Sequence, residues 1–236
     1  ALGQPVERRL SRLGVQFHLG AEATGARPAR GGAEVLLAGG DAVRAGKVLV
    51  TGLRQPNLPA GLEAAGIAVE PGRIPVDQAC RTSAANVYAV GDINGACGMA
   101  HVAIQQGMLV ARVRAGGAPG PTAWPSLPRA MFTIPEVAGA GAQPRDLDRQ
   151  GIAYTRSTVA LADTWRGIAK CVREGFVTLL TASDGRLLGA WAVGDGASEV
   201  AAPYGALVDR GATADDLLEA LFIHPTMSEA LLEAAW

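Results

Sequence analysis

The residues with the clearest capacity for chemistry lie near the end of the chain, in residues 224–229, which read His-Pro-Thr-Met-Ser-Glu. An imidazole has an unperturbed pKa of about 6.5, so His224 can serve as a general base near neutral pH. Glu229 follows five residues later, close enough to bond the ring, fix its tautomer and make it a stronger base. Thr226 and Glu229 also have the spacing of a capping box, in which Glu229 would only stabilise a helix start. The residues alone leave both interpretations open.

A second candidate site follows a short apolar stretch, residues 86–90, which predicts a strand that ends at Gly91 and Asp92. Glycine lets a ligand approach the backbone closely, and the Asp92 carboxylate can accept hydrogen bonds from sugar-type hydroxyl groups. Gly-Asp is also a common turn sequence, so these two residues by themselves are more typical of a plain turn.

The spacing of apolar residues predicts a helix from Met99 to about Arg114. The N–H groups of its first residues, Met99, Ala100 and His101, would point towards the same space as Asp92. Because a helix N-terminus carries about half a positive charge, it stabilises anionic groups. The two features would together suit a ligand with both hydroxyl and anionic groups, but the residues by themselves favour a plain turn and helix cap.

The segment before these residues carries too few elements for a complete domain. A helix is predicted over residues 5–13, and strands are predicted over 15–19, 34–38 and 47–51. We therefore expect residues 1–57 to be the end of a domain. Residues 116–128 contain four prolines and three glycines, and they are the best linker in the chain.

Beyond this linker the pattern changes to antiparallel strands with helices, which is typical of an α+β domain. Strands are predicted over 155–161, 168–172, 176–180 and 187–193, with a strand interrupted by Pro135 at 131–138. Helices are predicted over 197–208, after a cap at Thr213, and from about Thr226 onwards.

Composition excludes several classes of function. The 236 residues include 21 Lys and Arg against 22 Asp and Glu, a formal net charge of −1 that argues against binding to nucleic acid or an acidic membrane. No apolar run approaches the roughly 18 residues of a membrane-spanning helix. The three cysteines, Cys80, Cys97 and Cys171, show no metal-type or disulfide spacing. We expect a cytoplasmic protein with no metal site.

In their order and spacing, three motifs resemble the C-terminal half of the flavin-dependent pyridine nucleotide–disulfide oxidoreductases. They are Tyr-Ala-Val-Gly-Asp at 88–92, Met-Ala-His at 99–101, and His-Pro-Thr-Met-Ser-Glu-Ala-Leu at 224–231. The trailing Glu-Ala-Ala at 233–235 is most similar to the dihydrolipoamide dehydrogenase branch. The resemblance implies a mixed fold, in which partial α/β cofactor-binding segments precede an antiparallel α+β domain. Residues 1–57 would end an NAD(P)-binding domain, 58–122 would complete an FAD-binding domain, and 123–236 would form the dimerisation domain.

The resemblance also implies roles for the candidate residues. Asp92, after Gly91, would bond the ribityl chain of FAD, and the backbone at Met99 and Ala100, before His101, would face the flavin pyrimidine edge. His224 would act as base and acid on the redox disulfide of the other subunit of a homodimer, with Glu229 orienting it and the His224–Pro225 bond cis. Such an enzyme oxidises a dithiol, or reduces a disulfide, through FAD and NAD(P).

Departures from the family pattern limit these expectations. The hinge reads Leu-Arg-Gln-Pro-Asn at 53–57, and the sequence contains no glycine-rich FAD motif, no NAD(P) fingerprint and no paired redox cysteines. We therefore expect the C-terminal portion of a longer enzyme, inactive by itself and not necessarily retaining FAD. Two alternatives stay open: a non-catalytic dimerisation module, or part of a flavoprotein quinone reductase without redox cysteines.

Overall fold

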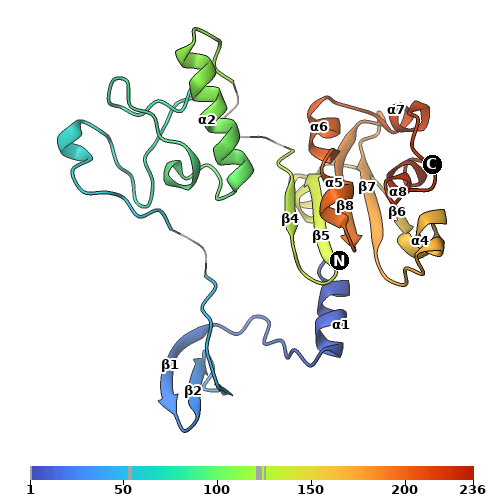
Figure 1. The fold of residues 1–236 in the computed structure, drawn as a ribbon, viewed down its shortest axis with the longest axis horizontal. Helices are drawn as coiled ribbons and strands as arrows, with labels where there is room; N and C mark the ends of the chain where they lie inside the picture. The colour runs from blue at the N-terminus through green and yellow to red at the C-terminus, as the bar shows by residue number, and fades with distance from the viewer. Residues whose placement is uncertain (1, 53–54, 121–123, 125) are drawn as a thin grey trace. The chain divides into compact units, whose positions relative to one another are not determined.

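The computed structural model describes residues 2–52, 55–120, 124 and 126–236. The chain divides into two compact units, which are described separately (Figure 1). The C-terminal unit comprises Ala1–Phe17 with Trp124–Trp236, and the central unit comprises His18–Ala123. Residues 53–54 of the predicted hinge, and residues 121–123 and 125 of the predicted linker, lie outside the described residues.

An antiparallel five-stranded sheet with strand order β4-β5-β8-β7-β6 forms the centre of the C-terminal unit (Figure 1). The strands are β4 (Arg129–Met131), β5 (Glu136–Gly141), β6 (Thr155–Ala160), β7 (Phe176–Thr181) and β8 (Leu187–Gly194). β7 and β8 are joined at the predicted hairpin, where Gly185 has a φ of +81° that glycine adopts without strain. The predicted strand at 131–138 is two strands, separated by a cis Ile134–Pro135 bond; of these two, β4 is at the sheet edge and β5 lies inside the sheet.

One face of this sheet carries the hydrophobic core. Alternate residues of β5, β7 and β8, such as Ala138, Val177 and Ala192, pack in one buried cluster with α5, α6 and α8. The helices of the unit are α1 (Gln4–Arg12), α3 (Pro144–Gln150), α4 (Trp165–Ala169), α5 (Ala197–Ala201), α6 (Tyr204–Asp209), α7 (Ala214–Glu219) and α8 (Glu229–Glu233), with a 3₁₀ turn η3 (Leu161–Asp163). The helix predicted over 197–208 is interrupted at Pro203, which has no N–H group to donate.

The opposite sheet face carries a row of cross-strand neighbours, Gly139, Trp191 and Thr178. The Trp191 indole N–H donates to the Ala142 carbonyl oxygen at 2.9 Å. A Cβ on Gly139 would lie 2.6 Å from the indole ring, so only glycine leaves room for Trp191. Trp191 is therefore fixed by one hydrogen bond and by the absence of a side chain on the neighbouring strand.

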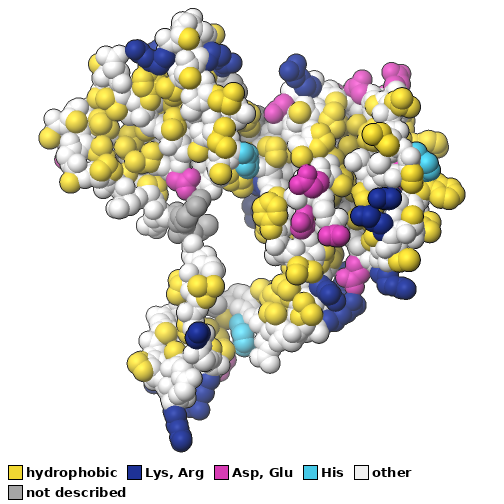
Figure 2. Space-filling model, viewed as in Figure 1, with side chains coloured by type: hydrophobic (Ala, Val, Ile, Leu, Met, Phe, Trp, Pro, Cys, Tyr) yellow, Lys and Arg dark blue, Asp and Glu magenta, His cyan; other side chains and the backbone are white. Residues whose placement is uncertain are grey.

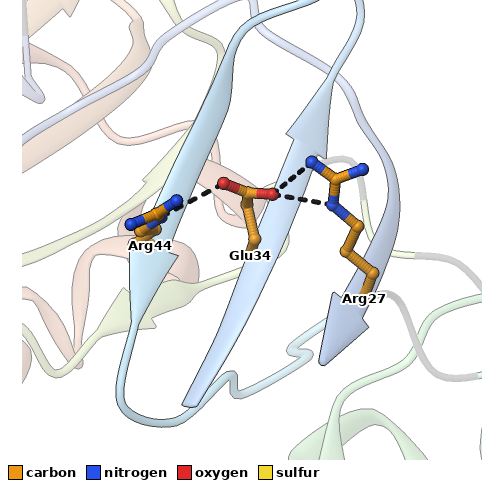
Figure 3. A network of polar contacts seen from close by, with 3 residues as sticks. All are labelled: Arg27, Glu34 and Arg44. Atoms are coloured by element: carbon orange, nitrogen blue, oxygen red, sulfur yellow. Dashed lines mark hydrogen bonds and ion pairs between the residues drawn. The ribbon is translucent and has the colours of Figure 1, made fainter. Parts of the chain in front are cut away.

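The central unit combines a small sheet with one long helix. Its antiparallel strands β1 (Ala23–Ala29), β2 (Gly32–Leu37) and β3 (Ala42–Ala45) pair in that order, and η1 (Glu63–Ala65), η2 (Gly91–Asn94) and α2 (Ala100–Arg114) follow. Glu34 of β2 accepts hydrogen bonds from Arg27 of β1 at 2.7 Å and Arg44 of β3 at 3.2 Å (Figure 3). The two guanidinium groups lower the pKa of Glu34 below its ordinary value, Arg27 contributing most.

The strands predicted over 15–19 and 47–51 are wrong. Both segments are irregular and solvent-exposed, with Leu49 86% accessible. Alternating apolar residues form a strand only where a neighbouring strand takes up their backbone hydrogen bonds. β2 pairs instead with residues 23–29. This segment contains Gly25 and Pro28, and because glycine and proline are rare in strands, its sequence does not predict one.

Two further predicted strands are also wrong. Residues 86–90 make only a single bridge, from Tyr88 to Arg81. The segment 168–172 overlaps α4, because the Thr164 hydroxyl caps that helix by accepting the Gly167 N–H at 3.0 Å. Within the described part of the chain, no helix is long and apolar enough to cross a membrane.

Candidate functional site

His224 and Glu229 are in direct contact in the C-terminal unit. His224 lies between α7 and α8 and precedes a cis peptide bond to Pro225, as the family resemblance implied. Its Nδ1 lies 2.9 Å from Oε1 of Glu229, the first residue of α8. The other carboxylate oxygen, Oε2, accepts the backbone N–H of Thr226 at 2.6 Å. Glu229 therefore combines the two roles that the sequence left open: it contacts the imidazole and stabilises the chain entering α8.

The electrostatics of Glu229 determine which ring nitrogen carries the proton. The hydrogen bond from the Thr226 backbone, and then the one from His224, lower the pKa of Glu229 below its ordinary value. Glu229 is thus an ionised carboxylate at neutral pH, and a carboxylate can only accept hydrogen bonds. Nδ1 of His224 must therefore donate, which leaves the lone pair of a neutral imidazole on Nε2.

An aromatic side chain lies beside this imidazole at the protein surface. The Trp165 indole lies edge-on to the His224 ring, with ring centroids 6.0 Å apart at 76°. The His224 side chain is 58% accessible, and the neighbouring Ile223 is 80% accessible. Further exposed apolar side chains are Ile168 in α4, Leu218 in α7, and Leu221 two residues after α7 ends. Hydrophobic surface is visible around these helices in Figure 2. The imidazole is open to a second molecule.

Gly91 and Asp92 begin the 3₁₀ turn η2 in the central unit, and this turn packs against α2. Gly91 has a φ of +79°, and a Cβ on it would lie 3.1 Å from the Cβ of Ala103 in α2. Glycine is therefore required both by the backbone conformation and by the close approach to the helix. The Asp92 carboxylate lies near the loop before α2: its Oδ2 is 3.9 Å from the point that a Cβ on Gly98 would occupy.

The first turn of α2 completes this second group of residues. Met99 is the N-cap residue, in extended conformation, and Ala100 and His101 are the first helical residues. The thioether of Met99 is at best a weak acceptor, unlike the oxygens that usually cap helices. The N-terminus of a 15-residue helix, at which Met99 makes no side-chain cap hydrogen bond, suits an anionic group, and an Asp carboxylate suits hydroxyl groups. The residues present therefore fit a flavin dinucleotide.

Sequence reasoning missed three side chains beside these sites: Trp165, Asn94 and Gln106. Trp165 gave no local signal, because it reaches His224 only through the packing of α4 near α8. Gln106 did give one, since it interrupts the apolar stripe formed by Val102 and Leu109 on the buried face of α2. A polar residue at a core position of a helix must satisfy its hydrogen bonds inside the protein.

The described residues hold no cluster of three or more His, Cys, Asp or Glu side chains that could bind a metal ion. All three cysteines, which are among the described residues, are free thiols. Burial, with a smaller contribution from Asp77, raises the pKa of the Cys80 thiol. Since a thiolate is the reactive form, the raised pKa and the burial of Cys80 disfavour a role as nucleophile.

The C-terminal unit thus carries an outward-facing imidazole held by a carboxylate, and the central unit carries a glycine turn packed against α2. The family model of the pyridine nucleotide–disulphide oxidoreductases matches residues 1–107, and that of their dimerisation domain matches residues 127–235. The chain belongs to the pyridine nucleotide–disulphide oxidoreductase family. This confirms the resemblance and the fold class expected from the sequence.

Individual relatives agree with this assignment. The chain is 34% identical to the dihydrolipoyl dehydrogenase of Pseudomonas aeruginosa and 35% identical to that of Halobacterium salinarum, covering 99% of this chain and 51% of each relative. The crystal structure of LpdA from Mycobacterium tuberculosis is similar with a TM-score of 0.90 and 29% identity, covering 98% of this chain and 51% of that protein. The chain thus spans about half the length of the curated relatives it matches. The division of residues 1–122 into two cofactor-binding domains stays a prediction.

Proposed function

We propose that this chain supplies the acid–base group and the subunit contact of a flavin-dependent dithiol–disulfide oxidoreductase of the dihydrolipoyl dehydrogenase type. The observation that carries the proposal is the 2.9 Å contact between His224 Nδ1 and Glu229 Oε1. It leaves Nε2 as a proton acceptor on an exposed face. The dihydrolipoyl dehydrogenases among the relatives support the choice of a dithiol as substrate.

Oxidation of a dithiol to a disulfide releases two electrons and two protons. A thiolate is the attacking species in thiol–disulfide exchange, so a base must first take a thiol proton. In our proposal Nε2 of His224 takes that proton, and Glu229 stabilises the resulting imidazolium through Nδ1–H. A redox disulfide, which the free Cys80, Cys97 and Cys171 do not provide, would accept the electron pair, and FAD and the nicotinamide, when bound, would supply the acceptors that follow. One proton would leave with the electron pair in the reduced nicotinamide, and the other would pass from His224 to solvent.

The central unit would hold the flavin. Asp92 would accept hydrogen bonds from hydroxyl groups of the ribityl chain, and the N-terminus of α2 at Met99, Ala100 and His101 would face the part of the ring that becomes anionic. When bound, FAD supplies a two-electron acceptor between the dithiol and the nicotinamide. The residues of this chain contribute binding and charge stabilisation, while the redox chemistry belongs to the cofactor.

The partner in this proposal is a second copy of the chain, bound through residues 123–236. The imidazole lies on an exposed face with Trp165, Ile168 and Ile223, which a second subunit would cover. Across such an interface His224 would reach the partner subunit's redox disulfide. Three unpaired thiols fit the reducing cytoplasm, which we propose as the compartment.

A fusion protein tests the catalytic part of the proposal. The N-terminal half of the Pseudomonas aeruginosa relative is joined to this chain, and dihydrolipoamide-dependent reduction of NAD⁺ is measured together with flavin content. We expect activity, and a loss of roughly 10²-fold or more in His224→Gln, the usual scale for acid–base catalysis. The matched control is His18→Gln, a histidine of the central unit. A flavin-loaded, dimeric fusion in which His224→Gln leaves turnover unchanged would contradict the proposal.

Sedimentation equilibrium tests the subunit contact in the chain as it stands. We expect a homodimer, and we expect Ile223→Asp to shift it to monomers because a charge would be buried in the interface. Leu19→Asp changes an equally exposed apolar residue of the central unit and should leave the dimer intact. A chain that is monomeric at all concentrations would argue against the proposed partner.

A further inference from the structure

The turn at Gly91–Asp92 is held by a buried amide network. Gln106 of α2 is fully buried, and its Oε1 accepts the backbone N–H of Gly91 at 2.7 Å. The same oxygen accepts from Nδ2 of Asn94 at 2.9 Å. Asn94 is also buried, and its amide further donates to the Ala89 carbonyl at 3.1 Å while its Oδ1 accepts the Ala96 N–H at 3.0 Å. The Oε1 atom of Gln106 thus accepts hydrogen bonds from both the first residue of η2, Gly91, and the last, Asn94.

This network costs the protein stability unless every group in it is satisfied. A buried amide without partners is unfavourable by roughly 1–3 kcal/mol, and an apolar residue would fill the same position on α2 more simply. The other buried residues of α2, Val102 and Leu109, are both apolar. The amide at Gln106 therefore specifies a conformation of the neighbouring backbone.

Gln106 and Ala103 lie three residues apart and share one face of α2. Ala103 limits how close Gly91 can come to the helix, and Gln106 prevents it from moving away. The two contacts act in opposite directions on the same residue. They fix the position of Gly91, and with it the direction in which Asp92 leaves the turn.

We infer that Gln106 is a positioning residue, with Asn94 as its second support, that holds Asp92 and the N-terminus of α2 as one rigid unit for binding a ligand. The ligand class, a flavin dinucleotide, rests on the proposed function. Asp92 and the N-terminus of α2 are held in position before the ligand binds. Ordering of the turn therefore does not reduce the binding free energy.

Amide hydrogen exchange of the 236-residue chain, followed by NMR, tests this inference. Gln106→Met removes the oxygen acceptor and keeps a side chain of similar length. We expect the Gly91 amide to exchange at least about fivefold faster, and the Asp92 backbone resonances to shift, since a buried donor has lost its partner. Gln105→Met, the exposed neighbour on the same helix, is the matched control and should change neither.

Gln106→Glu is the second variant, because it keeps an oxygen acceptor at this position. It should restore most of the protection of Gly91 even if Gln106→Met loosens the whole of α2. Unchanged exchange of Gly91 in Gln106→Met, or equal exchange in the Met and Glu variants, would overturn the positioning role.

Equilibrium dialysis of the same samples with FAD separates this inference from the proposed function. If the unaltered chain binds FAD, Gln106→Met should weaken binding by about tenfold, and unchanged affinity would overturn the role towards the ligand. If the unaltered chain binds no FAD while Gln106→Met still releases Gly91, the flavin assignment of Asp92 fails in this chain and the support of the turn by Gln106 is upheld.

Discussion

Glu229 binds the His224 imidazole with one carboxylate oxygen, at 2.9 Å, while its other oxygen is occupied by the backbone of the same loop. The carboxylate therefore cannot rotate away from the ring without giving up the Thr226 N–H. Glu229 therefore both caps the start of α8 and holds the His224 ring in place. Local chain geometry and site chemistry depend on the same side chain.

Glu229→Gln should disturb the tautomer of His224 more than the fold. A neutral amide can donate as well as accept, so it no longer requires Nδ1 to carry the proton. We expect ¹⁵N chemical shifts of the ring to show a mixture of tautomers, where the unaltered chain shows the Nδ1–H form. In the fusion protein, turnover should fall by at least roughly tenfold. If turnover follows only the loss of folded protein, Glu229 is merely a cap.

Glu229 and Glu233 should affect stability with opposite sign. The pKa of Glu229 is below its ordinary value of 4.5, so its contribution is present above that pH and is lost as the pH falls further. The pKa of Glu233 is above 4.5, because of burial first and then the charges of Glu229 and Asp163. Its ionisation therefore opposes folding at neutral pH and ceases to do so in acid.

Urea unfolding at pH 7 and pH 4 measures both effects. At pH 7, Glu229→Gln should lower the unfolding midpoint and Glu233→Gln should raise it. At pH 4 the effect of Glu233→Gln should be largely lost, while that of Glu229→Gln should shrink and disappear only as the pH falls further, through the lowered pKa of Glu229. Shifts of the same sign at neutral pH would show that the two carboxylates do not differ as the geometry indicates.

Gly139→Ala should destabilise the C-terminal unit. Its Cβ would lie 2.5 Å from the Ala190 carbonyl oxygen and 2.6 Å from the Trp191 ring, neither of which can move without disturbing the sheet. We expect a loss of about 1–3 kcal/mol or more, as for other overpacked positions. Gly107→Ala in α2 meets no atom within 4 Å and should instead stabilise by about 0.5–1 kcal/mol, because alanine favours a helix. Thermal unfolding of both variants provides the comparison.

Thr213→Ala should cost about 1 kcal/mol of stability. The Thr213 hydroxyl accepts the Asp216 N–H at 3.1 Å, and the Asp216 carboxylate accepts the Thr213 N–H at 2.7 Å, so the cap predicted at Thr213 is one half of a complete capping box. Ser228 occupies the corresponding position before α8 but makes no side-chain cap bond there. Ser228→Ala is therefore the control, and an equal cost in both variants would show that α7 does not depend on its cap.

Much of the C-terminal unit could be predicted because its signals are local. The hairpin between β7 and β8 follows from alternating apolar residues around a glycine turn, and the start of α7 follows from Thr213 and Asp216. The spacing of His224 and Glu229 allowed a contact between the two side chains but did not require it, because five extended residues can span more than about 15 Å; the loop geometry decided for contact. In each case the interacting groups are neighbours in the sequence, so the backbone itself limits where they can be.

Other features depended on contacts between distant segments. Residues 47–51 alternate like a strand but find no partner, while 23–29 form one because β2 lies beside them. The indole of Trp165 reaches His224, and the amide of Gln106 reaches Gly91, only once α4 and α2 have packed in place. The sequence by itself determined the chemical groups and their local geometry. Only the tertiary structure decided which distant side chains hold them, because those contacts depend on packing free energy summed over many residues and not on any short motif.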